Sequence, residues 1–192
     1  TKYLVPSSEF TTGPFFPVRY IDAGANDLTL VEGRRASGQP IEIHGRVVQR
    51  DGTPMHNLIL EIWQADANGL FRHPADPRAR DADPNFFGWG RAATDQDGHY
   101  RFRTIGPGAY AMPDGRPRAP HINMLIVFSG IARHLDTVVF FEGEAGNAAD
   151  PVLASVQPVA SRERLVAKRE APDRYRFDIR LRGEGETPFF ED

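Results

Sequence analysis

Residues 174–183 read RYRFDIRLRG and alternate strictly between apolar and charged side chains. Tyr175, Phe177, Ile179 and Leu181 fall on one side of an extended chain, whereas the arginines and the aspartate fall on the other. A period of two is typical of a β-strand that has one face on a core and one face in water. The stretch therefore predicts a half-buried strand near the C-terminus.

Other segments show the same alternation or a continuous apolar run. The strongest strand candidates are residues 41–49, 58–65, 100–104, 122–129 and 137–141. The last two are apolar almost throughout, which is typical of strands buried on both faces. The turn dipeptides Asp51–Gly52 and Asp97–Gly98, together with 18 glycines and 16 prolines, favour many short elements.

Helical periodicity is confined to two stretches, residues 145–156 and 161–170. The predicted fold is therefore all-β: an antiparallel β-sandwich with an N-terminal arm, long loops and one or two short helices. Residues 1–40 are interrupted by proline and glycine yet carry several aromatic side chains, so we expect an arm that packs on the body or contacts a partner. Residues 41–192 are expected to form the sandwich domain.

The composition is that of an ordinary globular protein, with 192 residues, 40% hydrophobic and 26% charged. A net charge of −3 excludes the basic surface with which proteins bind nucleic acids or anionic membranes. No apolar run approaches the ~20 residues of a membrane span, and no signal peptide is recognisable. The absence of cysteine excludes disulfides and iron–sulfur clusters. We therefore expect a cytoplasmic protein without nucleic-acid or membrane partners.

Several conspicuous residues have structural interpretations. Trp63 and Trp89 are expected to pack in the core, because large aromatic side chains dominate sandwich interiors. Asp66, Asp81 and Asp83 form an acidic group, but loop carboxylates commonly cap turns. Most of the histidines have no spacing that indicates a site, namely His44, His56, His73, His99 and His134.

A family resemblance rests on three segments in a fixed order: LILEIWQADANGLF (58–71), DPNFFGWGRAATDQDGHYRFRTIGPGAY (83–110) and RPRAPHINMLIVF (116–128). Together they resemble the intradiol ring-cleavage dioxygenases, from the TTGPF motif (11–15) to RGEGETPFF (182–190). The resemblance implies a non-heme Fe(III) oxidoreductase. In such enzymes O₂ is inserted between the two hydroxyl-bearing carbons of a catechol, which yields a muconate. It also implies a place in aromatic catabolism, in the β-ketoadipate pathway.

In that family two tyrosines and two histidines hold the iron. By position, Phe71 replaces the first tyrosine, Tyr110 matches the second, His121 matches the first histidine and Asn123 replaces the second. Phenylalanine cannot bind a metal, and asparagine is a poor, neutral ligand for Fe(III). The resemblance therefore implies no iron and no catalytic residue in this chain. Taken alone, His121 is also compatible with an ordinary buried histidine, and Tyr110 with a residue that closes a loop.

This pattern fits family members that pair two homologous chains, α and β, with the Fe(III) held by β. Four segments resemble α chains in particular: EGEAGNAADPVL (142–153), LVAKRE (165–170), YRFDIR (175–180) and GEGETPFF (183–190). The resemblance implies a homologous iron-binding β chain as partner, an aromatic diol and O₂ as substrates, and a higher (αβ)n oligomer. This chain alone is expected to be inactive.

In the two-chain members the arm of the α chain encloses the substrate above the iron of β. The matching residues, which are expected to bind substrate here, are Thr11, Gly13, Pro14 and Phe15. A Gly–Pro turn is stiff and its backbone is unhindered, so it can approach an aromatic ring closely. Related α chains place an arginine near the substrate carboxylate where this chain has Ser129. Arg133 is the candidate replacement, with a plain surface charge as the alternative.

Two other functions stay open at this point. A self-sufficient, homo-oligomeric catechol-type dioxygenase would need replacements for the ligands lost at Phe71 and Asn123. A non-enzymatic sandwich would bind a hydrophobic ligand as a carrier does, but a carrier has no need of the TTGPF arm. The sequence also leaves open the exact catechol, the number of αβ units and whether the degenerate iron pocket binds anything.

Overall fold

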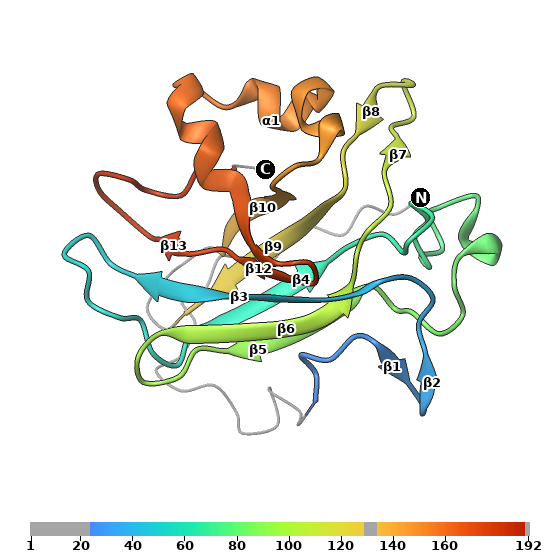
Figure 1. The fold of residues 1–192 in the computed structure, drawn as a ribbon, viewed down its shortest axis with the longest axis horizontal. Helices are drawn as coiled ribbons and strands as arrows, with labels where there is room; N and C mark the ends of the chain where they lie inside the picture. The colour runs from blue at the N-terminus through green and yellow to red at the C-terminus, as the bar shows by residue number, and fades with distance from the viewer. Residues whose placement is uncertain (1–23, 129–133, 191–192) are drawn as a thin grey trace, which may run out of the picture.

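The computed structural model describes residues 24–128 and 134–190 (Figure 1). The strands are β1 (Leu30–Val31), β2 (Arg34–Arg35), β3 (Pro40–Val48), β4 (Ile59–Trp63), β5 (Trp89–Ala93), β6 (His99–Ile105), β7 (Tyr110–Ala111), β8 (Pro117–Arg118), β9 (His121–Val127), β10 (Leu135–Phe141), β11 (Val166–Ala171), β12 (Arg174–Arg176) and β13 (Ile179–Arg180). The helical segments are η2 (Ala79–Asp81), η3 (Ala145–Ala149), α1 (Pro151–Ser155) and η4 (Val159–Leu165). The prediction of an all-β fold with few short helices is confirmed. Within the described ranges, no helix has the length and apolar character needed to cross a membrane.

Two groups of strands face each other across one core. The first group has the order β5–β4–β9–β10, and the second has the order β6–β3–β12. Strand β11 is hydrogen-bonded to both β10 and β12, so it joins the two groups. Most pairs are antiparallel as predicted, but β11 runs parallel to β10, and β12 and β13 run parallel to β3. Both groups contribute to the core, whose largest fully buried side chains include Ile43, Leu60, Phe102, Ile122 and Ile126.

The C-terminal alternating stretch keeps its predicted faces but splits into β12 and β13. Tyr175, Phe177 and Ile179 are all buried. At the break, the carbonyl of Phe177 accepts a 2.6 Å hydrogen bond from the buried hydroxyl of Tyr100. Position 45 on β3 must be glycine, because a Cβ there would lie 1.9 Å from the same carbonyl oxygen.

One of the two predicted helical stretches is correct. Residues 145–156 form η3 and α1, and Asp150 caps α1 by accepting the backbone N–H groups of Val152 and Leu153. The second prediction is wrong beyond Leu165, where η4 ends and β11 begins. Pairing of Val166 and the following residue with β10 outweighs a weak helical pattern.

The prediction of strands buried on both faces holds for β10 but not for β9. Residues 137–141 are all buried, because α1 and η4 cover the outer face of β10 with Leu153 and Leu165 (Figure 1). On β9 only one face is fully buried. Asn123 lies on the other, partly buried face, which is therefore open to one side of the molecule.

Two buried carboxylates shape the long loop between β4 and β5. Asp66 accepts two backbone N–H groups of its own turn, at 2.8 and 3.0 Å, and the N–H of Asp83 at 2.9 Å. Asp83 in turn accepts the N–H groups of Ser37 and Asn85 at 2.6 and 2.8 Å. The interpretation of these carboxylates as turn formers is confirmed. Their bonds fix the loop that carries Phe71.

The prediction that both tryptophans pack in the core is wrong. Trp63 is 36% exposed and Trp89 is 40% exposed. They are cross-strand partners at one end of the β4–β5 pair, and β5 is the outermost strand of its group. The chain therefore leaves two of its largest apolar side chains at the end of the sheet where the long loop begins.

Most of the predicted arm lies outside the described residues. Of residues 1–40, the structure describes 24–40. Within that part, Leu28 is buried in the main core, and its N–H donates to the carbonyl of Arg103 at 2.8 Å. The division of the chain after residue 40 stays a prediction.

Candidate functional site

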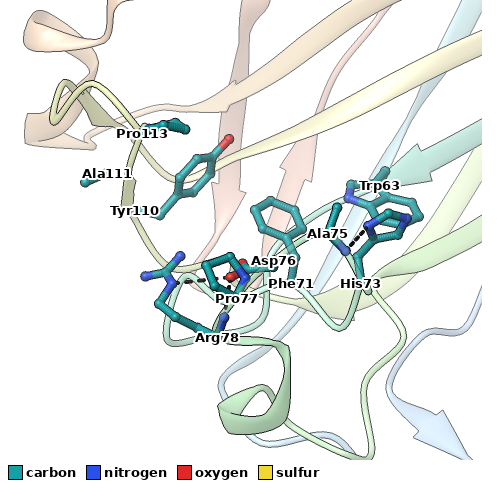
Figure 2. A pocket seen from close by; sticks show the side chains of 10 residues that line it. All are labelled: Trp63, Phe71, His73, Ala75, Asp76, Pro77, Arg78, Tyr110, Ala111 and Pro113. Atoms are coloured by element: carbon teal, nitrogen blue, oxygen red, sulfur yellow. Dashed lines mark hydrogen bonds and ion pairs between the residues drawn. The ribbon is translucent and has the colours of Figure 1, made fainter. Parts of the chain in front are cut away.

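A cavity of about 530 Å³ opens where the loop after β4 faces the short hairpin of β7 and β8 (Figure 2). We call it the Phe71 cavity. Its lining residues are Trp63, Phe71, His73, Ala75, Asp76, Pro77, Arg78, Tyr110, Ala111 and Pro113. The end of β4, the loop held by the buried carboxylates and the β7 strand thus supply one site.

A row of rings forms one wall of the Phe71 cavity. Phe71 packs edge-to-face against Tyr110, with ring centroids 5.2 Å apart and an interplanar angle of 84°. Trp63 lies 6.4 Å from Phe71 at an interplanar angle of 18°, and 5.7 Å from the ring of His73. Ring faces and edges of this kind are the usual lining of pockets that bind small organic ligands.

Tyr110 is hydrogen-bonded to His121, the first residue of β9. The Tyr110 hydroxyl lies 3.4 Å from Nε2 of His121, and Nδ1 lies 2.6 Å from the carbonyl oxygen of Ala119. A carbonyl can only accept, so Nδ1 carries the hydrogen, and Nε2 accepts from the Tyr110 hydroxyl. Burial, and then the neighbouring Arg118 guanidinium, lower the pKa of His121 to about 4. The imidazole is therefore neutral at physiological pH.

The tyrosine of this pair is also neutral. Burial raises the pKa of the Tyr110 phenol. The Arg118 guanidinium opposes that rise, and the Asp150 carboxylate adds to it. A protonated phenol next to a neutral imidazole makes a satisfied donor–acceptor pair.

A buried ion pair lies behind Tyr110. Nε of Arg118 lies 2.9 Å from Oδ2 of Asp150, and the two side chains are 10% and 0% exposed. Nη2 of Arg118 is buried without a hydrogen-bond partner among the described residues. Its guanidinium carbon lies 6.0 Å from the centre of the Tyr110 ring, at the outer limit of a cation–π contact.

The sequence did not indicate this pair, nor the places of His73 and Arg78 in the lining of the cavity. Arg118 and Asp150 are 32 residues apart, and nothing in their spacing indicates that they meet. The available signal was an arginine three positions before His121 in the RPRAPHINM segment. His73 lines the Phe71 cavity, although its position in the sequence carries no signal of a site.

The residues present do not fit a mononuclear Fe(III) site. Phe71 has no donor atom, and the Asn123 amide nitrogen lies 3.5 Å from the carbonyl oxygen of Trp63. Tyr110 and His121 are the two positions that keep a residue able to bind iron, and they are hydrogen-bonded to each other. In residues 24–128 and 134–190 there is also no group of three or more histidine, cysteine, aspartate or glutamate side chains that could hold a metal ion.

The predicted substrate-binding residues cannot be placed in this geometry. They lie outside the described residues and stay predictions: Thr11, Gly13, Pro14, Phe15 and Arg133. The four degenerate ligand positions are described. Phe71, Tyr110 and His121 form a chain of ring contacts, and Asn123 follows two positions after His121 on the same strand.

Two substitutions should create an iron site in this chain. Phe71→Tyr adds a phenol oxygen beside Tyr110, and Asn123→His adds an imidazole two positions after His121 on β9. We expect the isolated double variant to bind Fe(III) and to turn red-brown through phenolate-to-iron charge transfer. Each single variant is the matched control and should bind iron much more weakly. A folded double variant that stays colourless with Fe(III) would show that these positions do not converge on one metal.

The buried, neutral His121 should make folding stability depend on pH. The unfolded imidazole has a pKa near ~6.5, and the folded one has a pKa of about 4. Between these values the unfolded state binds more protons, so the free energy of unfolding falls as the pH drops, by about 3 kcal/mol in total.

Urea unfolding isolates this dependence when the free energy of unfolding is measured at several pH values from about 7.5 to about 4.5, a range that lies around and between the two pKa values. His121→Gln cannot titrate and should lose this part of the slope, whereas His56→Gln, at an exposed histidine, should keep it. Equal slopes for the wild type and His121→Gln would contradict the neutral, buried state of His121.

The sequence of this chain matches a known protein family. Residues 11–183 match the family described as Dioxygenase. The chain is 40% identical to the protocatechuate 3,4-dioxygenase alpha chain of Pseudomonas putida, over 81% of this chain and 78% of that one. It is 35% identical to the protocatechuate 3,4-dioxygenase beta chain of Burkholderia cepacia, over 98% of this chain and 86% of that one.

A solved structure agrees with the fold. The dioxygenase domain of a dioxygenase–carbohydrate-binding fusion from Streptomyces sp. SirexAA-E superposes with a TM-score of 0.60 at 26% identity, over 92% of this chain and 98% of that one. The resemblance inferred from the sequence segments is thereby confirmed. The chain belongs to the intradiol family of ring-cleaving dioxygenases.

Proposed function

We propose that this chain is the α subunit, the one without iron, of a protocatechuate 3,4-dioxygenase. The assembled enzyme would convert protocatechuate and O₂ into 3-carboxy-cis,cis-muconate. The Tyr110–His121 hydrogen bond beside Phe71 carries the proposal. It pairs the only two side chains at the four ligand positions that could bind Fe(III) well, so each has its polar atom occupied by the other. The chain alone would have no ring-cleaving activity.

The iron would be held by a homologous β chain. Similarity to both an alpha and a beta chain supports a pair of homologous chains related by a pseudo-twofold axis. Such αβ units would assemble further into an (αβ)n oligomer. The Fe(III) of the β chain would bind the diol oxygens and promote the attack of O₂, and no residue of this chain would touch the metal. We place the complex in the cytoplasm, in keeping with a chain that has no cysteine.

This chain would act on the substrate through its N-terminal arm. Residues 1–40 would form the partner-contacting extension, with residues 41–192 as the sandwich that carries it. The arm residues that would enclose the aromatic ring are Thr11, Gly13, Pro14 and Phe15. Arg133 would face the substrate carboxylate, in place of the arginine that related α chains carry at the position of Ser129.

Reconstitution tests this assignment. The chain purified alone should consume no O₂ with protocatechuate, whereas the chain co-expressed with the β chain of the same organism should be active. Removing residues 1–20 should lower turnover at least ~100-fold, since substrate positioning is worth several kcal/mol. Removing residues 1–10, which leaves the TTGPF motif intact, is the matched control and should preserve most of the activity.

Each contrary result points elsewhere. Ring cleavage by the isolated chain would favour the homo-oligomeric catechol-type enzyme. An inactive chain that does not assemble with β but binds hydrophobic ligands without residues 1–20 would favour the carrier.

Arg133→Ala should raise the KM for protocatechuate and leave the KM for catechol unchanged. An equal effect on both substrates would remove Arg133 from the carboxylate site.

A further inference from the structure

We propose that the Phe71 cavity is itself a binding site for a single-ring aromatic carboxylate, which it takes without a metal. The ring would lie against the aromatic wall, and the carboxylate would pair with Arg78. This site lies in the chain itself, so it is separate from the iron-dependent pocket proposed for the β chain.

The cavity has the right size for such a ligand. At about 530 Å³ it falls within the range of ~300–1,000 Å³ that is usual for small-molecule sites. Its side chains are mostly apolar. Asp66 accepts the backbone N–H groups of Asn68 and Leu70 just before Phe71, and the β7–β8 hairpin is closed by the Met112 N–H, which donates to the carbonyl of Arg116 at 2.8 Å. The site is therefore preformed, which reduces the free-energy cost of binding.

The aromatic wall supplies an apolar contact that the fold leaves open. Trp63 remains 36% exposed at the cavity, although it is among the largest apolar side chains of the protein. Covering such apolar surface with a ligand ring favours binding, because it removes that surface from water. Trp63 and Phe71 are only 6.4 Å apart, so a ligand ring would lie across them rather than between them. The edge-to-face arrangement of Phe71 and Tyr110 favours a flat ring over an aliphatic one.

The cation at the rim is Arg78 (Figure 2). Asp76 accepts the backbone N–H of Arg78 at 2.8 Å and the side-chain Nε at 3.4 Å, and these contacts anchor the near edge of the guanidinium. The terminal nitrogens have no hydrogen-bond partner within the described part of the chain. The Arg78 side chain is 49% exposed, whereas the Asp76 side chain is only 12% exposed, so the cation is the more accessible of the two charges. A planar guanidinium pairs with a carboxylate through two parallel hydrogen bonds.

The chemistry of the site selects a class of ligand that differs from that of an iron centre. The Tyr110 hydroxyl donates to His121, and the described part of the chain has no group of histidine, cysteine, aspartate or glutamate side chains that could hold a metal ion for adjacent hydroxyls to chelate. A carboxylate and an aromatic ring are therefore required, and a diol is not. We expect 4-hydroxybenzoate to bind, although it cannot chelate iron through two neighbouring oxygens.

Calorimetry on the full-length, chelator-treated chain tests the proposal with 4-hydroxybenzoate as the probe. We expect saturable binding to one site. Phenol, which has no carboxylate, and cyclohexanecarboxylate, which has no aromatic ring, should each bind at least ~10-fold more weakly. The chain has two tryptophans, so indole N–H signals in an NMR titration give a second readout. The Trp63 signal should move much more than that of Trp89, which does not line the cavity.

Variants locate the site. Arg78→Gln should weaken binding at least ~10-fold, since it removes a charge-assisted pair. Ala75→Trp should abolish binding by filling the cavity, and Arg80→Gln, at an exposed arginine outside the lining, should leave binding unchanged. The proposal is overturned if 4-hydroxybenzoate does not bind saturably, or if it binds equally well to Arg78→Gln and Ala75→Trp. Because the isolated chain is used, failure of the β-dependent activity leaves this result unaffected, and the reverse also holds.

Discussion

The carboxylate of Asp150 organises the part of the protein in which the family places its metal. It is fully buried and accepts hydrogen bonds from four donors: the side chain of Arg118 and the backbone N–H groups of Ala119, Val152 and Leu153. Two of these donors belong to the segment that leads into β9, and the other two begin helix α1. One side chain therefore holds together two parts of the chain that are far apart in sequence. A buried carboxylate with this many partners is costly to lose, because each donor would be left unpaired.

The electrostatics of the neighbouring residues follow from this ion pair. Arg118 is held behind Tyr110, where its charge disfavours a protonated His121 and its guanidinium faces the tyrosine ring. Tyr110 and His121 are both neutral, and each satisfies the other. With Phe71 packed on the tyrosine, a neutral hydrogen bond and ring contacts lie at the positions where the family resemblance places metal ligands. This arrangement meets the rule that buried polar groups must be paired.

The sequence predicted those features that follow from local periodicity. The alternation in β3, β6 and the C-terminal stretch is visible because each strand has one face on the core. The end of η4 at Leu165 was not predictable, because the following residues become a strand only through pairing with β10. The exposure of Trp63 also depends on tertiary structure, since the loop that curves around the Phe71 cavity leaves this side chain open on one side.

The candidate site likewise contains residues that the sequence predicted and residues that only the tertiary structure reveals. The ligand positions Phe71, Tyr110, His121 and Asn123 came from motif resemblance. In the structure the first three contact one another, and Asn123 faces the carbonyl of Trp63. The ion pair of Arg118 with Asp150 and the contributions of His73 and Arg78 to the cavity depend on contacts between distant segments. No pattern within a single segment of sequence encodes such contacts.

We propose that this chain holds a neutral, metal-free pocket at the place where related iron-binding chains hold Fe(III). The iron content and visible spectrum of the wild-type chain, purified alone after exposure to Fe(III), test it most directly. We expect a colourless protein with no bound iron. A red-brown protein with one iron per chain would contradict it, because phenolate ligation to Fe(III) would then have to come from residues other than the Tyr110–His121 pair described here.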